Sequence, residues 1–231
     1  MIIVKPKPNP KITIITVCYN SGSDLEDTIL NVLELTDPEL DYIIIDGGST
    51  DGSLNLIHKY ASRLKAYISE PDQGIYDAMN KGWGLADPES FILYLGAGDK
   101  ILNMPDKENF YNADVIFGDV EIGNKYLFKS KFNFMLRLGN TIHHQAEFVR
   151  KKIHTDPPFS LKYKIYSDFN FNQKLLLKKV RFIKDNSFRS YALEGGISYE
   201  FNNKEPLEIV KANFGTAHYL LAKLYYIYKK L

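Results

Sequence analysis

Short runs of consecutive apolar residues recur through the first half of this chain. They are ITIITV (residues 12–17), YIII (42–45), AYIS (66–69) and FILYL (91–95), of which the third is the weakest. Unbroken apolar runs of this length are typical of strands that are covered on both faces. We therefore expect four buried strands in this half of the chain.

A helical pattern follows each of the first three runs, over residues 23–35, 54–60 and 74–86. The alternation of strands and helices predicts a parallel sheet with crossover helices. Ligands of such sheets bind beyond the carboxyl ends of the strands. The polar residues that follow each strand are therefore the candidate site. The first helical segment repeats four apolar side chains at helical spacing: Leu25, Ile29, Val32 and Leu33.

The second half has a different pattern. Residues 115–130 indicate two short antiparallel strands, and residues 146–153 indicate another. Residues 166–179 (YSDFNFNQKLLLKK) are typical of a helix, because an acid near its start and lysines near its end complement the helix dipole. Residues 206–231 carry apolar side chains at helical spacing. They predict one or two amphipathic helices, with a break near Gly215.

Composition and charge indicate a folded protein with an uneven distribution of charge along its chain. With 231 residues and 45% apolar content, the chain can bury an ample core. Residues 1–124 hold 9 Lys/Arg against 20 Asp/Glu, whereas residues 125–184 hold 14 against 3. Such a basic segment attracts an anionic surface or acceptor. The apolar N-terminal stretch is too short for an export signal, no segment approaches a membrane span, and Cys18 has no partner for a disulfide, so we expect a cytoplasmic protein.

Each predicted strand of the first half ends in a polar cluster: TVCYN, DGGSTDGS, SEPDQG and GAGDK. These clusters bring Asp46, Asp72 and Asp99 to one rim of the sheet. Carboxylates repel a diphosphate unless a divalent cation lies between them, and Mg²⁺ and Mn²⁺ favour oxygen ligands and bridge phosphates. The chain has no phosphate-binding loop, and Ile101 breaks the glycine fingerprint that GAGDKI begins. The rim therefore predicts a metal-dependent nucleotide site.

Taken in order, TVCYN, DGGSTDGS, SEPDQGIYDAMNKG, YLGAGD, HHQA and YKIYSDFNF resemble the motif set of family-two inverting glycosyltransferases with the A-type fold. The similarity runs from about residue 11 to about residue 200. It is greatest to enzymes of bacterial surface-polysaccharide and lipid-linked-glycan assembly.

The resemblance implies an α/β nucleotide-diphospho-sugar transferase fold. A mainly parallel central sheet would be flanked by helices, with a small antiparallel acceptor-side region and C-terminal helices. The glycosyltransferase domain would span residues 1–200. Residues 11–124 of it would bind the nucleotide sugar and residues 125–200 the acceptor, and residues 201–231 would form an amphipathic helical tail.

The resemblance also implies a role for each matching residue. Asp168 would be the catalytic base, which accepts the proton of the acceptor hydroxyl. Asp99 would bind Mg²⁺ or Mn²⁺, which would neutralise the departing diphosphate. Asp46 would hydrogen-bond the nucleobase, a contact that suits uracil or thymine and leaves guanine open. The remaining nucleotide-site residues would be Thr16, Tyr19 and Asn20 in the base pocket, and Asp72, Gly74 and Asn80 beside the ribose and diphosphate.

Adjacent side chains on a strand point to opposite faces, so only one of His143 and His144 is expected to face the site. The resemblance puts His-Gln near the acceptor and diphosphate, which favours His144 with Gln145; a packed structural histidine is the alternative. Two positions depart from the family pattern. Gly98 stands where the family usually has an acid, which weakens the expected contact to the ribose or metal, and Asn170 stands where many relatives have a second acid after the base.

These observations predict an inverting glycosyltransferase that moves a hexose-type sugar from a nucleotide-sugar donor, preferably a UDP-sugar, to a hydroxyl of a glycan or polyprenyl-linked acceptor. Lys223, Lys229 and Lys230 fit a tail helix that rests on anionic lipid, so we expect peripheral contact with the inner face of the cell membrane. We expect no nucleic-acid partner. The alternatives are a non-catalytic nucleotide-sugar-binding relative, a nucleotidyltransferase, which would need a Gly-rich basic loop after the first strand, and a nucleotide-dependent oxidoreductase, which the incomplete fingerprint disfavours.

Overall fold

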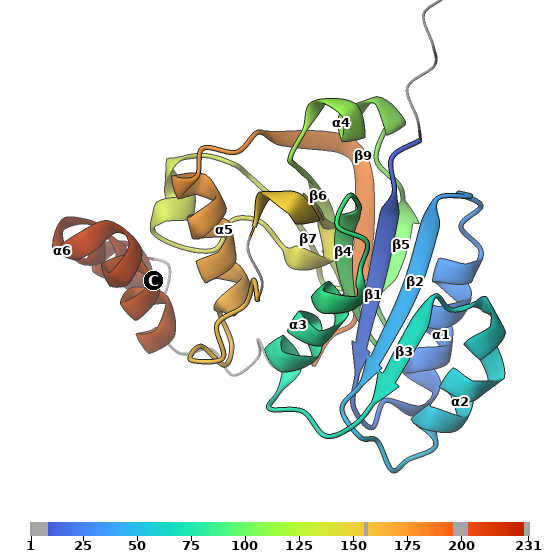
Figure 1. The fold of residues 1–231 in the computed structure, drawn as a ribbon. Helices are drawn as coiled ribbons and strands as arrows, with labels where there is room; N and C mark the ends of the chain where they lie inside the picture. The colour runs from blue at the N-terminus through green and yellow to red at the C-terminus, as the bar shows by residue number, and fades with distance from the viewer. Residues whose placement is uncertain (1–8, 155–156, 196–202, 229–231) are drawn as a thin grey trace, which may run out of the picture.

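The four apolar runs form neighbouring parallel strands in one half of a nine-stranded sheet, in the order β3-β2-β1-β4 (Figure 1). The computed structural model describes residues 9–154, 157–195 and 203–228. The parallel pairing confirms the prediction for this half of the chain. The strands are β1 (Ile12–Cys18), β2 (Leu40–Asp46), β3 (Ala66–Ser69) and β4 (Phe91–Gly96).

The sheet continues into the second half of the chain, where its direction is mixed. β8 lies between β4 and β6 and is antiparallel to both, and β7 is antiparallel to β6, as the pattern predicted. Two strands were not predicted: β9, which runs parallel to β6, and β5, which pairs with β9 at the edge. These strands are β5 (Lys100–Asn103), β6 (Val115–Ile122), β7 (Tyr126–Phe128), β8 (Glu147–Arg150) and β9 (Phe182–Ala192).

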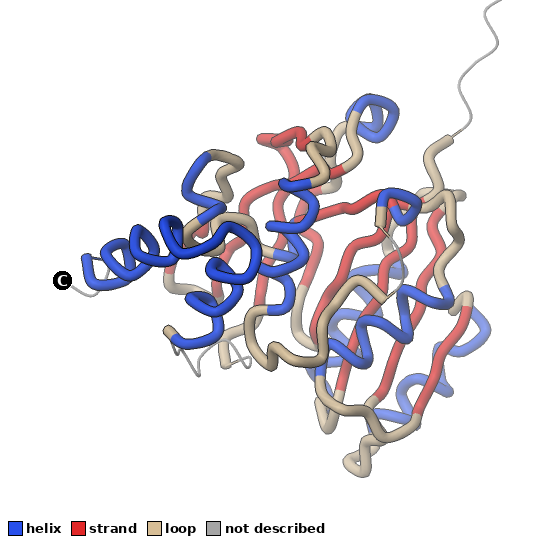
Figure 2. The backbone as a smooth tube through the Cα atoms, turned by 60° about the vertical axis from the view of Figure 1, so that its left-hand side comes forward, coloured by secondary structure: helices blue, strands red, loops and turns tan. Residues whose placement is uncertain are grey.

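Helices cover both faces of the sheet (Figure 2). Because side chains alternate along β1, Ile14 packs with α1 and α2 on one face, whereas Ile15 packs with α3 and α5 on the other. Trp83 of α3 is fully buried and its ring lies edge-on to that of Phe171, which confirms a core position. The helices are α1 (Gly22–Leu33), α2 (Ser53–Tyr60), α3 (Ile75–Leu85), α4 (Lys107–Asn112), α5 (Ser167–Leu177) and α6 (Lys204–Tyr228).

The C-terminal helix α6 lies beside α5, away from α1 and α2 (Figure 1). Its inner side chains join Phe169 of α5 in a third apolar cluster. Gly215 has a φ of 81° and a ψ of −174°, so the helix is broken there, as predicted. Residues 229–231, and with them two of the tail lysines, lie outside the described residues. No helix in the described part of the chain is long and apolar enough to cross a membrane.

Candidate active site

A cavity of about 720 Å³ opens beyond the carboxyl ends of β1 and β4. One wall comes from the first half of the chain, through the loop after β1, the start of α3 and the loop after β4. The opposite wall comes from the second half. The lining of that second wall is Asn140, His143, His144, Gln145, Ile165, Tyr166, Asp168, Leu193, Glu194 and Gly195.

The loop after β1 is held from outside the cavity by the polar cluster that follows β2. The Asn20 N–H donates to Ser49 Oγ (2.7 Å), and the Thr50 N–H donates to Asn20 Oδ1 (2.8 Å). The Gly22 N–H donates to Asp51 Oδ2 (2.8 Å). Asn20 adopts a φ of 48°, a conformation that asparagine tolerates better than most residues. The second cluster therefore fixes the shape of the loop rather than lining the cavity itself.

Four of the predicted nucleotide-site residues line the cavity: Tyr19, Asn20, Asp72 and Gly74. Tyr19 is 64% exposed, so its ring is accessible to a planar group. Asp72 Oδ1 accepts the Gly74 N–H (2.8 Å), which fixes the turn into α3 while the carboxylate remains at the cavity wall.

Three predicted nucleotide-site residues do not line the cavity. Thr16 is fully buried, and its hydroxyl shares a hydrogen bond with the Tyr42 hydroxyl. Asp46 is also fully buried. The Asn80 side chain pairs with the backbone N–H and carbonyl of Phe159.

The Asp46 carboxylate accepts hydrogen bonds from two serines. Ser69 Oγ donates to Oδ2 (2.6 Å), and the hydroxyl and N–H of Ser49 also donate to the carboxylate. Because Asp46 is fully buried and does not line the cavity, this arrangement disfavours the predicted contact between Asp46 and a nucleobase. Asp46 instead holds the loop that supports Asn20.

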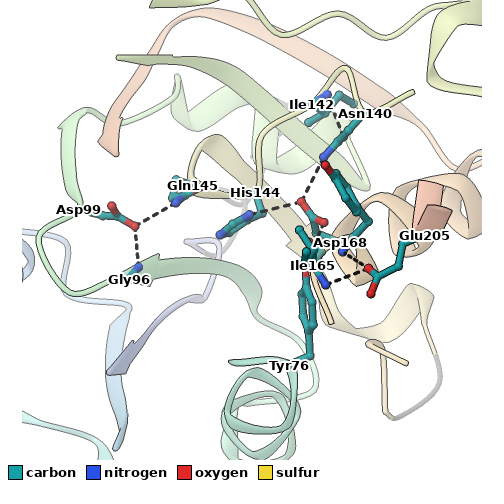
Figure 3. A network of polar contacts seen from close by, with 11 residues as sticks. Tyr76, Gly96, Asp99, Asn140, Ile142, His144, Gln145, Ile165, Asp168 and Glu205 are labelled. Atoms are coloured by element: carbon teal, nitrogen blue, oxygen red, sulfur yellow. Dashed lines mark hydrogen bonds and ion pairs between the residues drawn. The ribbon is translucent and has the colours of Figure 1, made fainter. Parts of the chain in front are cut away.

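Asp99 sits between the cavity and the end of β9. Its Oδ1 accepts the Leu193 N–H (2.9 Å), and its Oδ2 accepts the Gly96 N–H (2.6 Å) and Gln145 Nε2 (3.1 Å), as Figure 3 shows for the last two. Burial raises the pKa of Asp99, and the Leu193 and Gly96 N–H groups oppose that shift. The carboxylate is therefore oriented by three donors, of which Gly96 is close to Asp99 in the sequence and Gln145 and Leu193 are distant.

Gly98, where the family usually has an acid, has a φ of 90°. A Cβ atom at this position would lie 2.4 Å from a methyl carbon of Leu193. The backbone conformation and the lack of space both favour glycine, so an acid at position 98 would strain this loop and displace the Leu193 side chain.

The residues near Asp99 fit a cation that is shared with a phosphate ligand. No group of three or more His, Cys, Asp or Glu side chains in the described ranges could hold a metal alone. The Gln145 Oε1 atom, beside Asp99, is buried without a hydrogen-bond partner. One carboxylate and one orphaned amide oxygen match the small protein contribution that Mg²⁺ needs when substrate phosphates supply other ligands.

Asp168 lies in the first turn of α5 and is 8% exposed. Asn140 Nδ2 donates to its Oδ2 (3.1 Å), the Tyr76 hydroxyl lies 3.1 Å from Oδ1, and His144 Nδ1 lies 3.5 Å from Oδ2 (Figure 3). Burial raises the pKa of Asp168, but the proximity of His144 and the Phe169 N–H lower it by more, so the pKa of Asp168 lies below its usual value. Asp168 is therefore an ionised carboxylate that faces the cavity.

The expectation that only one of the two histidines faces the site was wrong. Both line the cavity, with ring centroids 5.5 Å apart, because residues 144–146 form a 3₁₀ turn instead of continuing β8. Burial and the neighbouring His144 lower the pKa of His143 to about 4. His143 is therefore neutral at neutral pH.

Sequence reasoning missed Tyr76 and Asn140, which line the cavity and contact Asp168. Tyr76 lies inside the quoted motif SEPDQGIYDAMNKG, so the motif could have revealed it. Asn140 lies three residues before His143, and a single asparagine in the sequence does not show whether it belongs to a site or to a loop.

The comparison with known families agrees with this geometry. The family model described as "Glycosyl transferase family 2" matches residues 13–171, which include the first wall of the cavity and the part of the second wall from Asn140 to Asp168. The chain belongs to this family. The motif resemblance is therefore confirmed, and the protein is a family-two glycosyltransferase.

Relatives of this family-two chain include a PGL/p-HBAD biosynthesis glycosyltransferase of Mycobacterium bovis, which is 28% identical over 176 residues. That alignment covers 71% of this chain and 68% of the mycobacterial protein. Among solved structures, Staphylococcus aureus TarS 1-349 in complex with UDP-GlcNAc has a TM-score of 0.66 at 19% identity, and the match covers 88% of this chain and 66% of TarS.

A mannosyltransferase of Pyrobaculum calidifontis, solved with GDP-Man and Mn²⁺, has a TM-score of 0.59 at 18% identity. The match covers 83% of this chain and 59% of that one. At these identities the two structures establish the glycosyltransferase A-type fold of this chain. This chain spans about two thirds of TarS and less of the mannosyltransferase.

Proposed function

We propose that this family-two chain is an inverting transferase that moves a hexose-type sugar from a nucleotide-sugar donor to a hydroxyl of a glycan or lipid-linked acceptor. One observation carries the proposal: the ionised Asp168 and the Asp99 carboxylate line the same cavity. They lie on opposite sides of the His144–Gln145 segment (Figure 3). TarS and the mannosyltransferase were solved with UDP-GlcNAc and GDP-Man, which supports a nucleotide-sugar donor.

In this proposal the donor lies on the wall built by the first half of the chain. The exposed Tyr19 ring would stack on the nucleobase, and the Asn20 loop would contact the nucleotide. Asp72 and Gly74 would lie beside the ribose and diphosphate. A UDP-sugar remains our preferred donor, and the buried Thr16 and Asp46 would act by supporting this wall.

In the proposed reaction the acceptor hydroxyl oxygen attacks the anomeric carbon from the side opposite the diphosphate. The bond between that carbon and the diphosphate oxygen breaks, and its electron pair leaves with the diphosphate. Asp168 accepts the hydroxyl proton. Because the attack is a single displacement on the face opposite the leaving group, the anomeric configuration inverts. Mg²⁺ or Mn²⁺, held by Asp99 with Gln145 beside it, would supply positive charge to the diphosphate when bound.

A thermal-shift panel with UDP-, dTDP-, GDP- and CDP-sugars, each with and without Mn²⁺, tests the donor assignment. A ligand at about 100 times its dissociation constant stabilises the fold by about 2.7 kcal/mol. For a chain of this size, that corresponds to a rise in melting temperature of roughly 5–10 °C. We expect the largest rise with a UDP-sugar and Mn²⁺. If no sugar nucleotide raises the melting temperature, the proposal fails; binding without any turnover would favour the non-catalytic alternative.

We also propose that α6 brings the enzyme to an anionic membrane, where a lipid-linked acceptor would lie. Its second part exposes a row of apolar side chains on the side opposite the core contacts of Ala222 and Tyr226. No Asp or Glu occurs from Lys211 to Tyr228, and Lys223 flanks the row. The exposed row is Leu220, Leu221, Leu224, Ile227 and Tyr228, whose exposed fractions range from 46% to 79%.

Cosedimentation with vesicles tests this contact. We expect the protein to pellet with vesicles that contain an anionic phospholipid and to remain in solution with purely zwitterionic ones, because apolar burial and charge attraction act together. Leu224→Glu should abolish pelleting, whereas Leu30→Glu, at an exposed leucine of α1, should not. Equal pelleting of both variants, or a dimer that forms through this row without lipid, would contradict the proposal.

A further inference from the structure

Glu205, in the first turn of α6, binds a backbone segment that is 40 residues earlier in the chain. Its Oε1 accepts the Lys164 N–H (2.9 Å), and its Oε2 accepts the Ile165 (2.9 Å) and Tyr166 (3.1 Å) N–H groups. Three consecutive amides therefore converge on one carboxylate, and Figure 3 shows the contact between Glu205 and Ile165. Charge-assisted hydrogen bonds of this kind are stronger than neutral ones, so this contact fixes the position of segment 164–166.

Segment 164–166 lies just before Asp168 in the chain, and the Tyr76 hydroxyl contacts both the segment and Asp168. The Tyr76 hydroxyl donates to the Ile165 carbonyl oxygen (2.7 Å) and also lies 3.1 Å from Asp168 Oδ1. Burial, and then the charge of Asp168, raise the pKa of Tyr76, so this phenol keeps its single proton. The Ile165 carbonyl and the Asp168 carboxylate therefore compete for one donor.

The position of Ile165 decides this competition. Its carbonyl belongs to the residue whose N–H is bound by Glu205, so the contact in α6 also holds the carbonyl against Tyr76. If segment 164–166 moved away, the Tyr76 proton would turn fully to Asp168. A carboxylate that accepts an additional full hydrogen bond is a weaker proton acceptor, and its oxygen would be aimed less well at the acceptor hydroxyl.

We propose that Glu205 is a positioning residue for the transfer reaction: through segment 164–166 and Tyr76, it keeps Asp168 oriented and basic. This inference rests on the proposed role of Asp168 as the base. It gives α6 a function inside the active site in addition to its packing against α5, because the carboxylate that completes the arrangement comes from the C-terminal helix.

The test compares Glu205→Gln with Glu208→Gln. Glu208 lies on the same helix, and its side chain is 62% exposed and 3.9 Å from Lys162 Nζ. In Glu205→Gln we expect kcat per donor-binding site to fall about 10- to 100-fold. A misplacement of a reacting group by about 1 Å lowers the rate by up to about 100-fold. The donor dissociation constant, measured by calorimetry, should stay within about twofold because Glu205 does not contact the donor wall. Glu208→Gln should match the wild type in both.

A merely structural role would act on the fraction of folded protein. It would leave kcat per donor-binding site unchanged, and that result would overturn the proposal. A double-mutant cycle gives a second criterion: if Glu205 acts through Tyr76, the losses in kcat of Glu205→Gln and Tyr76→Phe should be less than multiplicative, whereas independent roles would multiply.

Amide hydrogen exchange separates this inference from the proposed function. In Glu205→Gln the amides of residues 164–166 should exchange at least tenfold faster than in the wild type, with residues 12–18 of β1 unchanged as an internal reference. Unchanged exchange at 164–166 would overturn the inference even in an active enzyme. If the wild type transfers no sugar but exchange at 164–166 accelerates, the proposed function fails while the fixation of this segment by Glu205 stands.

Discussion

Asp168→Asn should lower kcat for sugar transfer about 10²- to 10⁴-fold, the range that a positioned general base contributes. Asparagine has nearly the same shape but cannot accept the hydroxyl proton. Asp168 belongs to the wall opposite Tyr19 and Asp72, so the dissociation constant of the nucleotide sugar should change less than about threefold. Initial rates at saturating donor and calorimetric donor binding measure the two effects separately.

A matched control for this substitution is Asp41→Asn. Asp41 lies in β2, and its carboxylate is 3.6 Å from Lys65 Nζ at the surface. An exposed ion pair of this kind contributes little to stability, so transfer and binding should both match the wild type. If Asp168→Asn retained transfer within about twofold of the wild type, Asp168 would not be the base.

Removal of divalent metal should weaken nucleotide binding strongly. The described residues provide too few side chains to hold a cation without phosphate oxygens, so cation and nucleotide should bind cooperatively. Coupling of this kind is typically worth about 5- to 150-fold in affinity, and it is reciprocal. Calorimetry with UDP should give a tighter dissociation constant with Mn²⁺ than with EDTA, and Mn²⁺ should bind tighter with UDP by the same factor.

Asp99→Asn should remove most of this coupling while metal-free UDP binding changes little. The substitution puts an N–H₂ group among the Gly96, Gln145 and Leu193 donors, so the melting temperature must be measured beside it. Asp41→Asn serves again as the unchanged control. A wild-type affinity for UDP that Mn²⁺ alters less than twofold would exclude a shared cation at Asp99.

The fold of the first half followed from its sequence because its strands are buried on both faces and therefore appear as apolar runs. β9 could not be found in this way. Its side chains include Lys184, Asp185 and Arg189, and its pairing with β6 is interrupted by a shift of register. β5 is only four residues long and pairs with β9, so it is recognisable only once β9 is known.

The part of the site that follows from the topology of the sheet was predicted from the sequence. The carboxyl ends of parallel strands meet at one edge, which brought Tyr19, Asp72 and Asp99 to one cavity. The sequence could not tell whether a polar side chain faces a ligand or a neighbouring loop. Thr16 and Asp46 share the expected edge, but Tyr42, Ser49 and Ser69 satisfy their polar atoms, and only the tertiary fold supplies those partners.

The histidines were misjudged for a local reason. The period of two along a strand holds only within the strand, and β8 begins at Glu147, after the HHQA turn. The contribution of Glu205 was beyond sequence reasoning, since an acid in the first turn of an amphipathic helix is usually read as a response to the helix dipole.

The three hydrogen bonds of Asp99 also limit the construction of chimeras between this enzyme and its relatives. Two of its donors, Gln145 and Leu193, come from the part of the chain that would bind the acceptor, although Asp99 itself belongs to the donor part. A chimera that takes its acceptor part from another enzyme would therefore also replace the groups that orient Asp99. Grafts intended to change the acceptor should keep the host Gln145 and the backbone path that presents the N–H of residue 193 to Asp99; otherwise we expect donor binding to change along with acceptor choice.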